Sequence, residues 1–138
     1  MMSSKQVFYT ISSIILLVVV IAIVPSYHIK AQEQNEQNDP LIILSSIKNL
    51  LQKSIAELNA GNYTGASELV DIAYIDNYEY IEDPLKELDQ DLMEETEIMI
   101  RKDLASAIED KKPIEEITTL HNNIKTNLDK AEQLFKQQ

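Results

Sequence analysis

The sequence contains no cysteine and no tryptophan, and it has only two glycines, four prolines and two phenylalanines in 138 residues. Without cysteine, no disulfide can offset the small size of the chain, and metal sites built on thiolates are excluded. So few glycines and prolines argue against a β-sandwich, which needs turn residues at short intervals. These absences predict an all-α protein that is held together by packing alone.

Residue types that commonly perform catalysis are also scarce. No cysteine nucleophile is available, and no glycine-rich phosphate-binding loop occurs. A serine, histidine and acid triad would have to use His28 or His121, and neither histidine lies in a supporting motif. The sequence therefore predicts a protein that is not an enzyme.

One apolar run is long enough to cross a bilayer, and it extends from Val7 to Val24. A helix of this length would span roughly 27 Å, close to the thickness of the hydrocarbon core. Lys5 precedes the run and an acidic chain follows it, which favours an N-terminus inside the cytoplasm and the remainder outside. We expect residues 1–31 to be a signal-anchor that holds a single-pass protein in the cell membrane.

The same run also has the length of a signal-peptide core. Because Ala31 offers a small residue to a signal peptidase, a secreted product that is cleaved near Ala31 is the alternative. Residues 32–40 begin with QEQNEQN, which has no apolar side chain, so we expect a polar linker there. The folded domain is then expected to comprise residues 41–138.

The chain after the apolar run is strongly negative. Residues 32–138 hold ten of the 12 Lys and Arg but all 23 Asp and Glu. A field of this sign repels nucleic acid and attracts cations. We therefore expect no nucleic-acid partner, and the predicted location favours a membrane transporter or a surface protein as partner.

Hydrophobic spacing and helix-start residues predict four helices in the domain. Asp39 before Pro40 and Asp89 are typical N-caps, and Pro113 is expected at a first helical position. The expected ranges are about 40–58, 64–83, 89–109 and 113–135. Because the connections are short, we expect an up-down-up-down four-helix bundle; a long helical hairpin that self-associates is the alternative.

The apolar stripes predict which side of each helix is packed. The stripes of the first and fourth helices are Leu44, Ile47, Leu51, Ile55 and Leu58, and Ile114, Ile117, His121, Ile124, Leu128, Ala131 and Phe135. A regular helix would place Tyr80, Asp76 and Asn77 beside the packed residues of the second helix. It would also place Asp103 within the stripe of the third helix. His121 is expected to be a partly buried, hydrogen-bonded residue rather than a ligand.

The acidity is concentrated in the second and third predicted helices. Residues 64–110 contain 15 Asp and Glu against three Lys and Arg. Carboxylates and tyrosine oxygens are hard ligands that suit iron(III), manganese, calcium or magnesium. Two interpretations remain open: a solvated acidic surface whose tyrosines fill the core, or a cation site in which Asp76, because it lies toward the packed side, needs a partner or a ligand.

A resemblance bears on this choice. The stretch AYIDNYEYIEDPL, residues 73–85, followed by Leu92-Met93, Glu97 and Arg101, resembles the extracytoplasmic helical domain fused to some high-affinity iron permeases. In that family an Ala-Tyr, an aromatic-Glu and a further Glu recur in one helix, and Glu and Arg follow in the next. The resemblance covers about 40 residues and selects Tyr74, Tyr78, Glu79, Glu82, Glu97 and Arg101 as the functional positions here. The first five are the metal ligands that it implies, and Arg101 is expected as the ion-pair partner of Glu97.

The resemblance does not extend to transport. The chain has no further apolar run of membrane-spanning length and no Arg-Glu-x-x-Glu motif. The resemblance therefore implies an accessory domain that collects or senses iron or another hard cation. The alternative is a structural or protein-interaction domain at the cell surface that binds no metal.

Two further features follow from spacing alone. Glu97 precedes Arg101 by one helical turn, which predicts an ion pair between them. The tripeptide Asn62-Tyr63-Thr64 is an acceptor sequence for N-glycosylation in an exported surface loop, and an unmodified loop asparagine is the alternative.

Overall fold

The computed structural model of the protein describes residues 39–138, and these residues form helices and short turns without a β-strand. The all-α prediction is therefore confirmed for this part of the chain. The helical segments are α2 (Pro40–Asn59), α3 (Tyr63–Ala73), the π-helix η1 (Tyr74–Tyr78), α4 (Glu79–Leu88), α5 (Gln90–Ile98), the π-helix η2 (Met99–Leu104), α6 (Ala105–Glu109) and α7 (Ile114–Phe135). Since α3, η1 and α4 are continuous, as are α5, η2 and α6, we call them the α3–α4 rod and the α5–α6 rod.

The helix ends agree closely with the start signals in the sequence. The Asp39 carboxylate accepts a hydrogen bond from the Leu41 amide at 2.8 Å, and the Asp89 carboxylate accepts one from the Leu92 amide at 2.9 Å. Both side chains satisfy amides that have no partner within their own helix. Pro113 is the N-cap residue that precedes α7, whereas we expected it at the first helical position.

The core is drawn from all four helical rods. Apolar side chains that are essentially inaccessible to solvent include Leu44, Ile47, Leu51, Val70, Tyr78, Ile81, Leu85, Ile100, Leu104, Ile108, Ile117, Ile124 and Leu128. The stripe predicted for α7 is buried from Ile117 to Ala131, and that of α2 is buried except for the partly exposed Ile55. Residues 38–138 form one compact unit that contains this whole core, so this fragment has what it needs to fold by itself.

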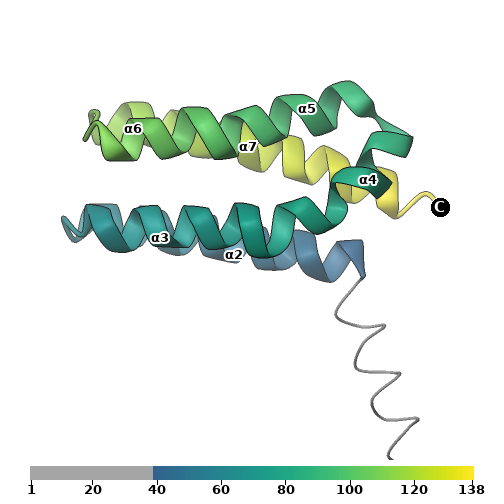
Figure 1. Ribbon diagram of the computed structural model, residues 1–138, viewed down its shortest axis with the longest axis horizontal. Helices are drawn as coiled ribbons and strands as arrows, with labels where there is room; N and C mark the ends of the chain where they lie inside the picture. Colours follow the sequence, from purple (N-terminus) through teal and green to yellow (C-terminus); the bar gives the residue numbers. More distant parts are fainter. Residues whose placement is uncertain (1–38) are drawn as a thin grey trace, which may run out of the picture. The chain divides into compact units, whose positions relative to one another are not determined.

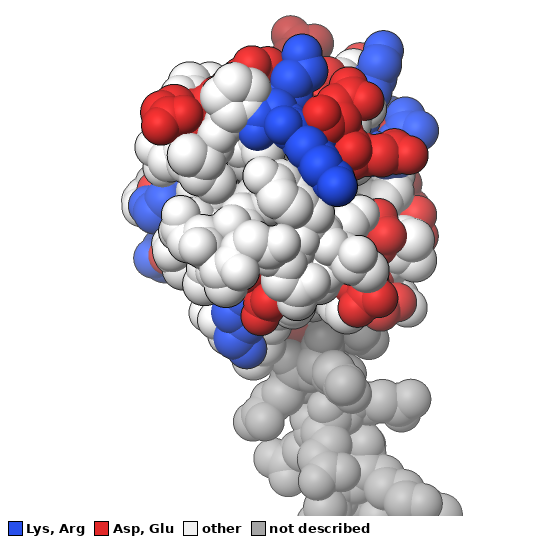
Figure 2. Space-filling view, turned by 90° about the vertical axis from the view of Figure 1, so that its left-hand side faces the viewer, with Lys and Arg blue, Asp and Glu red and all other residues white. Residues whose placement is uncertain are grey.

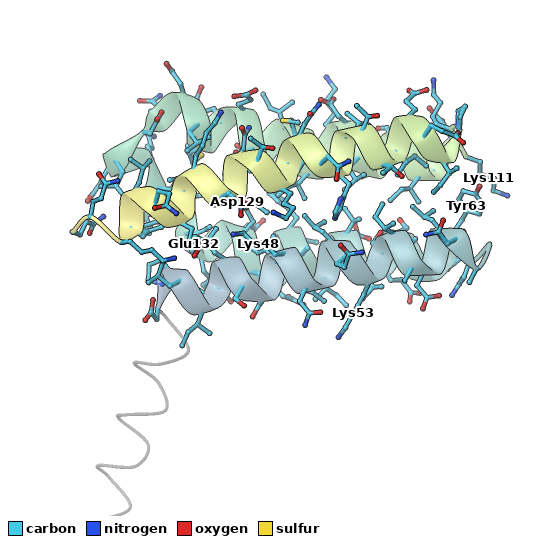
Figure 3. All side chains as sticks on the ribbon, turned by 180° about the vertical axis from the view of Figure 1, so that it is seen from behind. Lys48, Lys53, Tyr63, Lys111, Asp129 and Glu132 are labelled. Carbon is cyan, nitrogen blue, oxygen red and sulfur yellow. The ribbon has the colours of Figure 1, made fainter. Side chains whose placement is uncertain are left out.

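The rods pack in two layers. Figure 1 shows α2 beside the α3–α4 rod in one layer and the α5–α6 rod beside α7 in the other. Contacts between α2 and α7, and between α4 and α5, join the layers. Lys48 of α2 strengthens the first contact, because its Nζ lies 2.5 Å from a carboxylate oxygen of Asp129 and 2.5 Å from one of Glu132 (Figure 3).

The two π-helical segments shift the packing phase of their rods, and three sequence-based predictions were wrong for this reason. A π turn bonds residue i to i+5, so it adds one residue between successive core positions. In the α3–α4 rod the buried position after Ala73 is Tyr78, and Tyr80 is turned outward and 66% exposed. Asp76 is exposed as well, instead of lying on the packed side.

The α5–α6 rod also contains a π-helical segment, and its packed positions drift in the same direction. Its buried residues Leu92, Thr96, Ile100, Leu104 and Ile108 follow at spacings of four, longer than the 3.6 residues of a regular turn, and Asp103 is exposed rather than part of the apolar stripe. In the first π segment Asn77 is half-buried and donates through Nδ2 to the Ile72 carbonyl at 2.9 Å. That local bond gives the asparagine the partner that its position requires.

Within residues 39–138, none of the helices combines the length and the apolar character needed to cross a membrane. The span predicted at residues 7–24, the cleavage position at Ala31 and most of the linker at residues 32–40 lie outside the described residues.

Candidate functional site

Glu97 of α5 is the centre of a polar cluster between the two long rods. Its Oε1 accepts from the Tyr74 hydroxyl at 3.3 Å and lies 3.1 Å from Nε of Arg101. Tyr74 belongs to η1 and Arg101 to η2, so the two π-helical segments meet through this carboxylate. The ion pair between Glu97 and Arg101 that their spacing predicts is present.

Aromatic contacts hold the cluster against the core. The rings of Tyr74 and Tyr78 stack with centroids 6.3 Å apart and an interplanar angle of 24°. The guanidinium carbon of Arg101 lies 6.0 Å from the Tyr74 ring centroid, within the range of a cation–π contact. Tyr78 is fully buried, and its hydroxyl donates to the Met93 carbonyl at 2.8 Å. Tyr78 is thus fixed as a core residue, and Tyr74 stands at the polar edge.

Glu82 of α4 supplies a second carboxylate to the cluster. Its Oε1 is buried and has no hydrogen-bond partner, the one side-chain atom of this kind in residues 39–138. Burial raises the pKa of Glu82, and the negative charges of Glu97 and Glu79 raise it further. The nearby Tyr74 hydroxyl lowers this pKa in part, but the hydrogen bond of that hydroxyl goes to Glu97. A buried carboxylate oxygen without a partner costs free energy, so it marks a place where a proton or a cation would be favourable.

The pKa values of both tyrosine hydroxyls in the cluster are raised. Burial, followed by the charges of Glu82 and Glu97, raises the pKa of Tyr74 to about 12. Burial likewise raises the pKa of Tyr78. Tyr74 is therefore a neutral phenol at pH 7 while no cation is bound.

The remaining predicted positions divide between the cluster and the solvent. Glu79 is exposed and acts on Glu82 only through its charge. Asp76 is exposed and stands apart from the hydrogen bonds of the cluster. Asn62 caps α3: its Oδ1 accepts from the Gly65 amide at 3.1 Å, and its Nδ2 donates to Glu57 at 2.6 Å. A glycan on Asn62 would be attached at that same nitrogen.

In residues 39–138, no three side chains of His, Cys, Asp and Glu converge closely enough to hold a metal ion by themselves. A cation at the cluster would therefore take two carboxylates, from Glu82 and Glu97, and complete its shell with other oxygens. Tyr74 is the nearest source, because its hydroxyl already contacts Glu97. Water supplies further ligands in most calcium and magnesium sites.

Sequence reasoning missed the π-helical segments themselves. They carry no composition signal, but π turns occur frequently at functional sites, and here both contribute side chains to one cluster. Ala73 and Tyr78 are successive buried positions five residues apart, but this spacing is visible only once burial is known from the structure.

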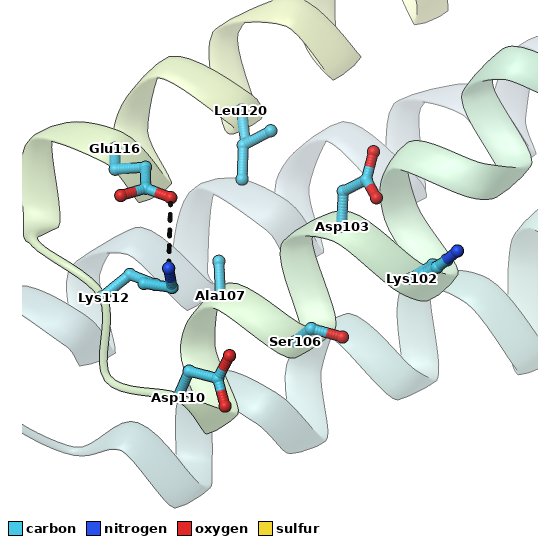
Figure 4. A pocket seen from close by; sticks show the side chains of 8 residues that line it. All are labelled: Lys102, Asp103, Ser106, Ala107, Asp110, Lys112, Glu116 and Leu120. Atoms are coloured by element: carbon cyan, nitrogen blue, oxygen red, sulfur yellow. Dashed lines mark ion pairs between the residues drawn. The ribbon is translucent and has the colours of Figure 1, made fainter.

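His121 and a shallow pocket beside α6 and α7 lie outside this cluster. His121 is buried on α7, and burial lowers its pKa, so it is neutral at pH 7. A shallow pocket of about 320 Å³ lies along α6 and the start of α7, lined by two lysines, three carboxylates, a serine and the apolar Ala107 and Leu120 (Figure 4). Lys112 and Glu116 in its wall approach to 3.9 Å.

Charges of both signs also neighbour each other at the end of the domain where α3 begins. Figure 2 views this end, with Lys and Arg close to Asp and Glu along one edge and uncharged side chains across the middle. At the same end, Nζ of Lys111 lies 5.6 Å from the ring centroid of Tyr63 (Figure 3). The α3–α4 rod, by contrast, is predominantly acidic, because residues 63–88 contain seven Asp and Glu but one Lys.

Comparison with known proteins places the chain in no family. No protein-family model, no curated protein and no solved structure matches it.

Proposed function

We propose that the domain binds a hard cation at the cluster of Tyr74, Glu82 and Glu97. The observation that carries this proposal is the buried Glu82 Oε1 without a partner, which lies next to the charge of a second carboxylate. A cation between the two carboxylates would remove both their repulsion and the unpaired oxygen. Iron, manganese, calcium and magnesium all prefer such oxygen ligands.

Arg101 fills the role of counter-ion while no cation is bound. Its Nε pairs with Glu97, yet its side chain is 55% exposed and reaches the carboxylate from the solvent side. An arginine in this position can swing outward without opening the core. Exchange of Arg101 for a cation therefore needs a side-chain rotation and no rearrangement of the rods.

The setting of this site belongs to the same proposal. We propose an up-down-up-down bundle, supported by the short turns that join successive rods and by the contacts of α2 with both α3 and α7. We further propose that residues 7–24 tether this bundle outside the cytoplasm, or that it is released after cleavage near Ala31. The resemblance to the extracytoplasmic domain of iron permeases supports an accessory role in iron uptake, and the positions it selects include Tyr74, Glu82 and Glu97.

Isothermal titration tests the proposal. Fragment 38–138 is titrated with manganese(II), calcium and citrate-buffered iron(III) at pH 7.5, and we expect saturable binding of at least one of them. Glu82→Gln and Glu97→Gln should each weaken binding about ten-fold or more, because each removes one of two charged ligands. The matched control is Glu87→Gln, an exposed carboxylate on the same rod, which should leave the affinity unchanged.

Two results would count against cation binding. One is the absence of heat with all three metals. The other is an affinity that falls as much in Glu87→Gln as in Glu82→Gln, which would indicate diffuse attraction to an acidic surface. Either result would leave a structural or interaction domain as the function.

A further inference from the structure

The outer face of the α3–α4 rod carries an exposed apolar patch that the cation site does not use. Ile72 is 40% exposed, Ile75 is 54% exposed and Tyr80 is 66% exposed. Ile72 and Ile75 are three residues apart, and Ile75 and Tyr80 are five apart, which are spacings that place neighbours on one face across a π turn. We call these three residues the outer patch.

The π-helical segment η1 is what exposes this patch. A regular helix would turn Tyr80 toward the packed side with Ala73, whereas the extra residue of the π turn directs Tyr78 into the core and Tyr80 into solvent. Exposing a large aromatic ring beside two isoleucines forgoes the free energy of burying them. An exposed apolar group of this kind marks an interaction site more often than isolated surface residues do.

Charge around the outer patch restricts what can cover it. Its exposed neighbours in sequence are Glu68, Asp71, Asp76, Glu79 and Asp83, and the only basic residue of the rod is Lys86. A second copy of the chain that docked through the same face would bring these carboxylates against each other. Nucleic acid and anionic lipid are repelled for the same reason.

We propose that the outer patch is a docking surface for a partner protein that presents a basic amphipathic helix. The apolar side of such a helix would cover Ile72, Ile75 and Tyr80, and Lys or Arg on its flanks would pair with the surrounding carboxylates. Recognition of an amphipathic helix through a few apolar anchors is a recurring mode of binding. Aromatic residues such as Tyr80 commonly supply much of the affinity at interfaces.

The test uses a synthetic peptide and fragment 38–138. The peptide is an amphipathic helix of about 18 residues, long enough to be helical when bound, with leucine on one face and lysine on both flanks. Binding is followed by fluorescence anisotropy of the labelled peptide. We expect Ile75→Ser with Tyr80→Ser to weaken binding about ten-fold or more, and 0.5 M salt to weaken binding to the unchanged fragment, because it screens charges.

Matched controls separate this surface from non-specific attraction. Ile98→Ser removes an isoleucine that is 46% exposed on α5, outside the outer patch, and should bind the peptide like the unchanged fragment. A peptide with glutamate in place of lysine should not bind. Circular dichroism of the double variant should show unchanged helix content, because both substituted side chains are exposed.

Several outcomes would overturn the proposal. They are no binding of the basic peptide, equal binding by the double variant, and an equal loss in Ile98→Ser. Sedimentation that shows a dimer which the double variant abolishes would instead assign the patch to a second copy. Cation binding by the double variant should be unchanged, so failure of this proposal and failure of the cation site remain distinguishable.

Discussion

Replacement of Glu82 by glutamine should make the domain more stable while it weakens cation binding. Burial and the charges of Glu97 and Glu79 raise the pKa of Glu82, and its Oε1 has no hydrogen-bond partner. An unpartnered buried polar group costs about 1–3 kcal/mol. Glutamine keeps the shape and a polar oxygen that still lacks a partner, so it removes only the additional cost that the charge brings, and we expect about 1 kcal/mol of added stability.

The assay is thermal and urea unfolding of fragment 38–138 at pH 7.5. For a domain of about 100 residues, 1 kcal/mol corresponds to a rise in Tm of about 4–8 °C. Glu87→Gln, exposed on the same rod, should change the free energy of unfolding by less than about 0.5 kcal/mol. This control separates the effect of the buried site from a general reduction of negative charge.

The pH dependence gives the prediction a second test. Because the folded-state pKa of Glu82 is raised, its ionised form destabilises the fold fully above that pKa, and the effect is lost as the pH falls to the ordinary value of 4.5. The stability difference between Glu82→Gln and the unchanged fragment should therefore shrink between pH 7.5 and pH 4.5. A variant that is less stable at pH 7.5 would refute the reasoning, since it would mean that the charge of Glu82 supports the fold.

Three further substitutions test the packing. Tyr78→Phe removes the buried hydrogen bond to the Met93 carbonyl and should lower the free energy of unfolding by about 1 kcal/mol in urea denaturation; no loss would mean that this bond does not stabilise the fold. Asp89→Ala removes the cap of α5 and should cost about 1 kcal/mol, measured in the same way, whereas Asp89→Asn should restore most of it. Ile124→Ala empties a fully buried position and should cost about 2–5 kcal/mol, and a cost below 1 kcal/mol would argue against the packed core around α7.

Much of the helical framework could be predicted because local signals and packing agree there. On α7 the predicted stripe follows spacings of three and four, and its central members Ile117, His121, Ile124, Leu128 and Ala131 are all buried. Asp39 and Asp89 begin helices because their side chains can satisfy free amides, a local property that needs no tertiary information.

The candidate site could be predicted only in part, because its geometry depends on the π-helical segments. A regular helix was assumed in placing Asp76 and Tyr80 toward the core, and one additional residue in the turn reverses both placements. The local sequence YIDNY does not distinguish a π turn from an α turn. The packing of Tyr78 against α5, which is a tertiary contact, distinguishes them.

The number of carboxylates at the site also depends on tertiary contacts, which cannot be derived from the spacing along one helix. Spacing along one helix can bring Glu79 and Glu82 onto neighbouring positions, but only the contact between rods decides which carboxylate faces Glu97. Glu82 does so and Glu79 stays exposed. The cluster therefore has two carboxylates and a tyrosine, where the family resemblance implied a larger set.

Location of a bound metal ion tests the central claim most directly. Crystals of fragment 38–138 are soaked in manganese(II), and anomalous scattering then locates the ion without reference to any assumed ligand. We predict one anomalous peak between the carboxylates of Glu82 and Glu97 and near the Tyr74 hydroxyl, with Arg101 turned away from Glu97. A peak elsewhere on the acidic surface, or none at this cluster, would contradict the account.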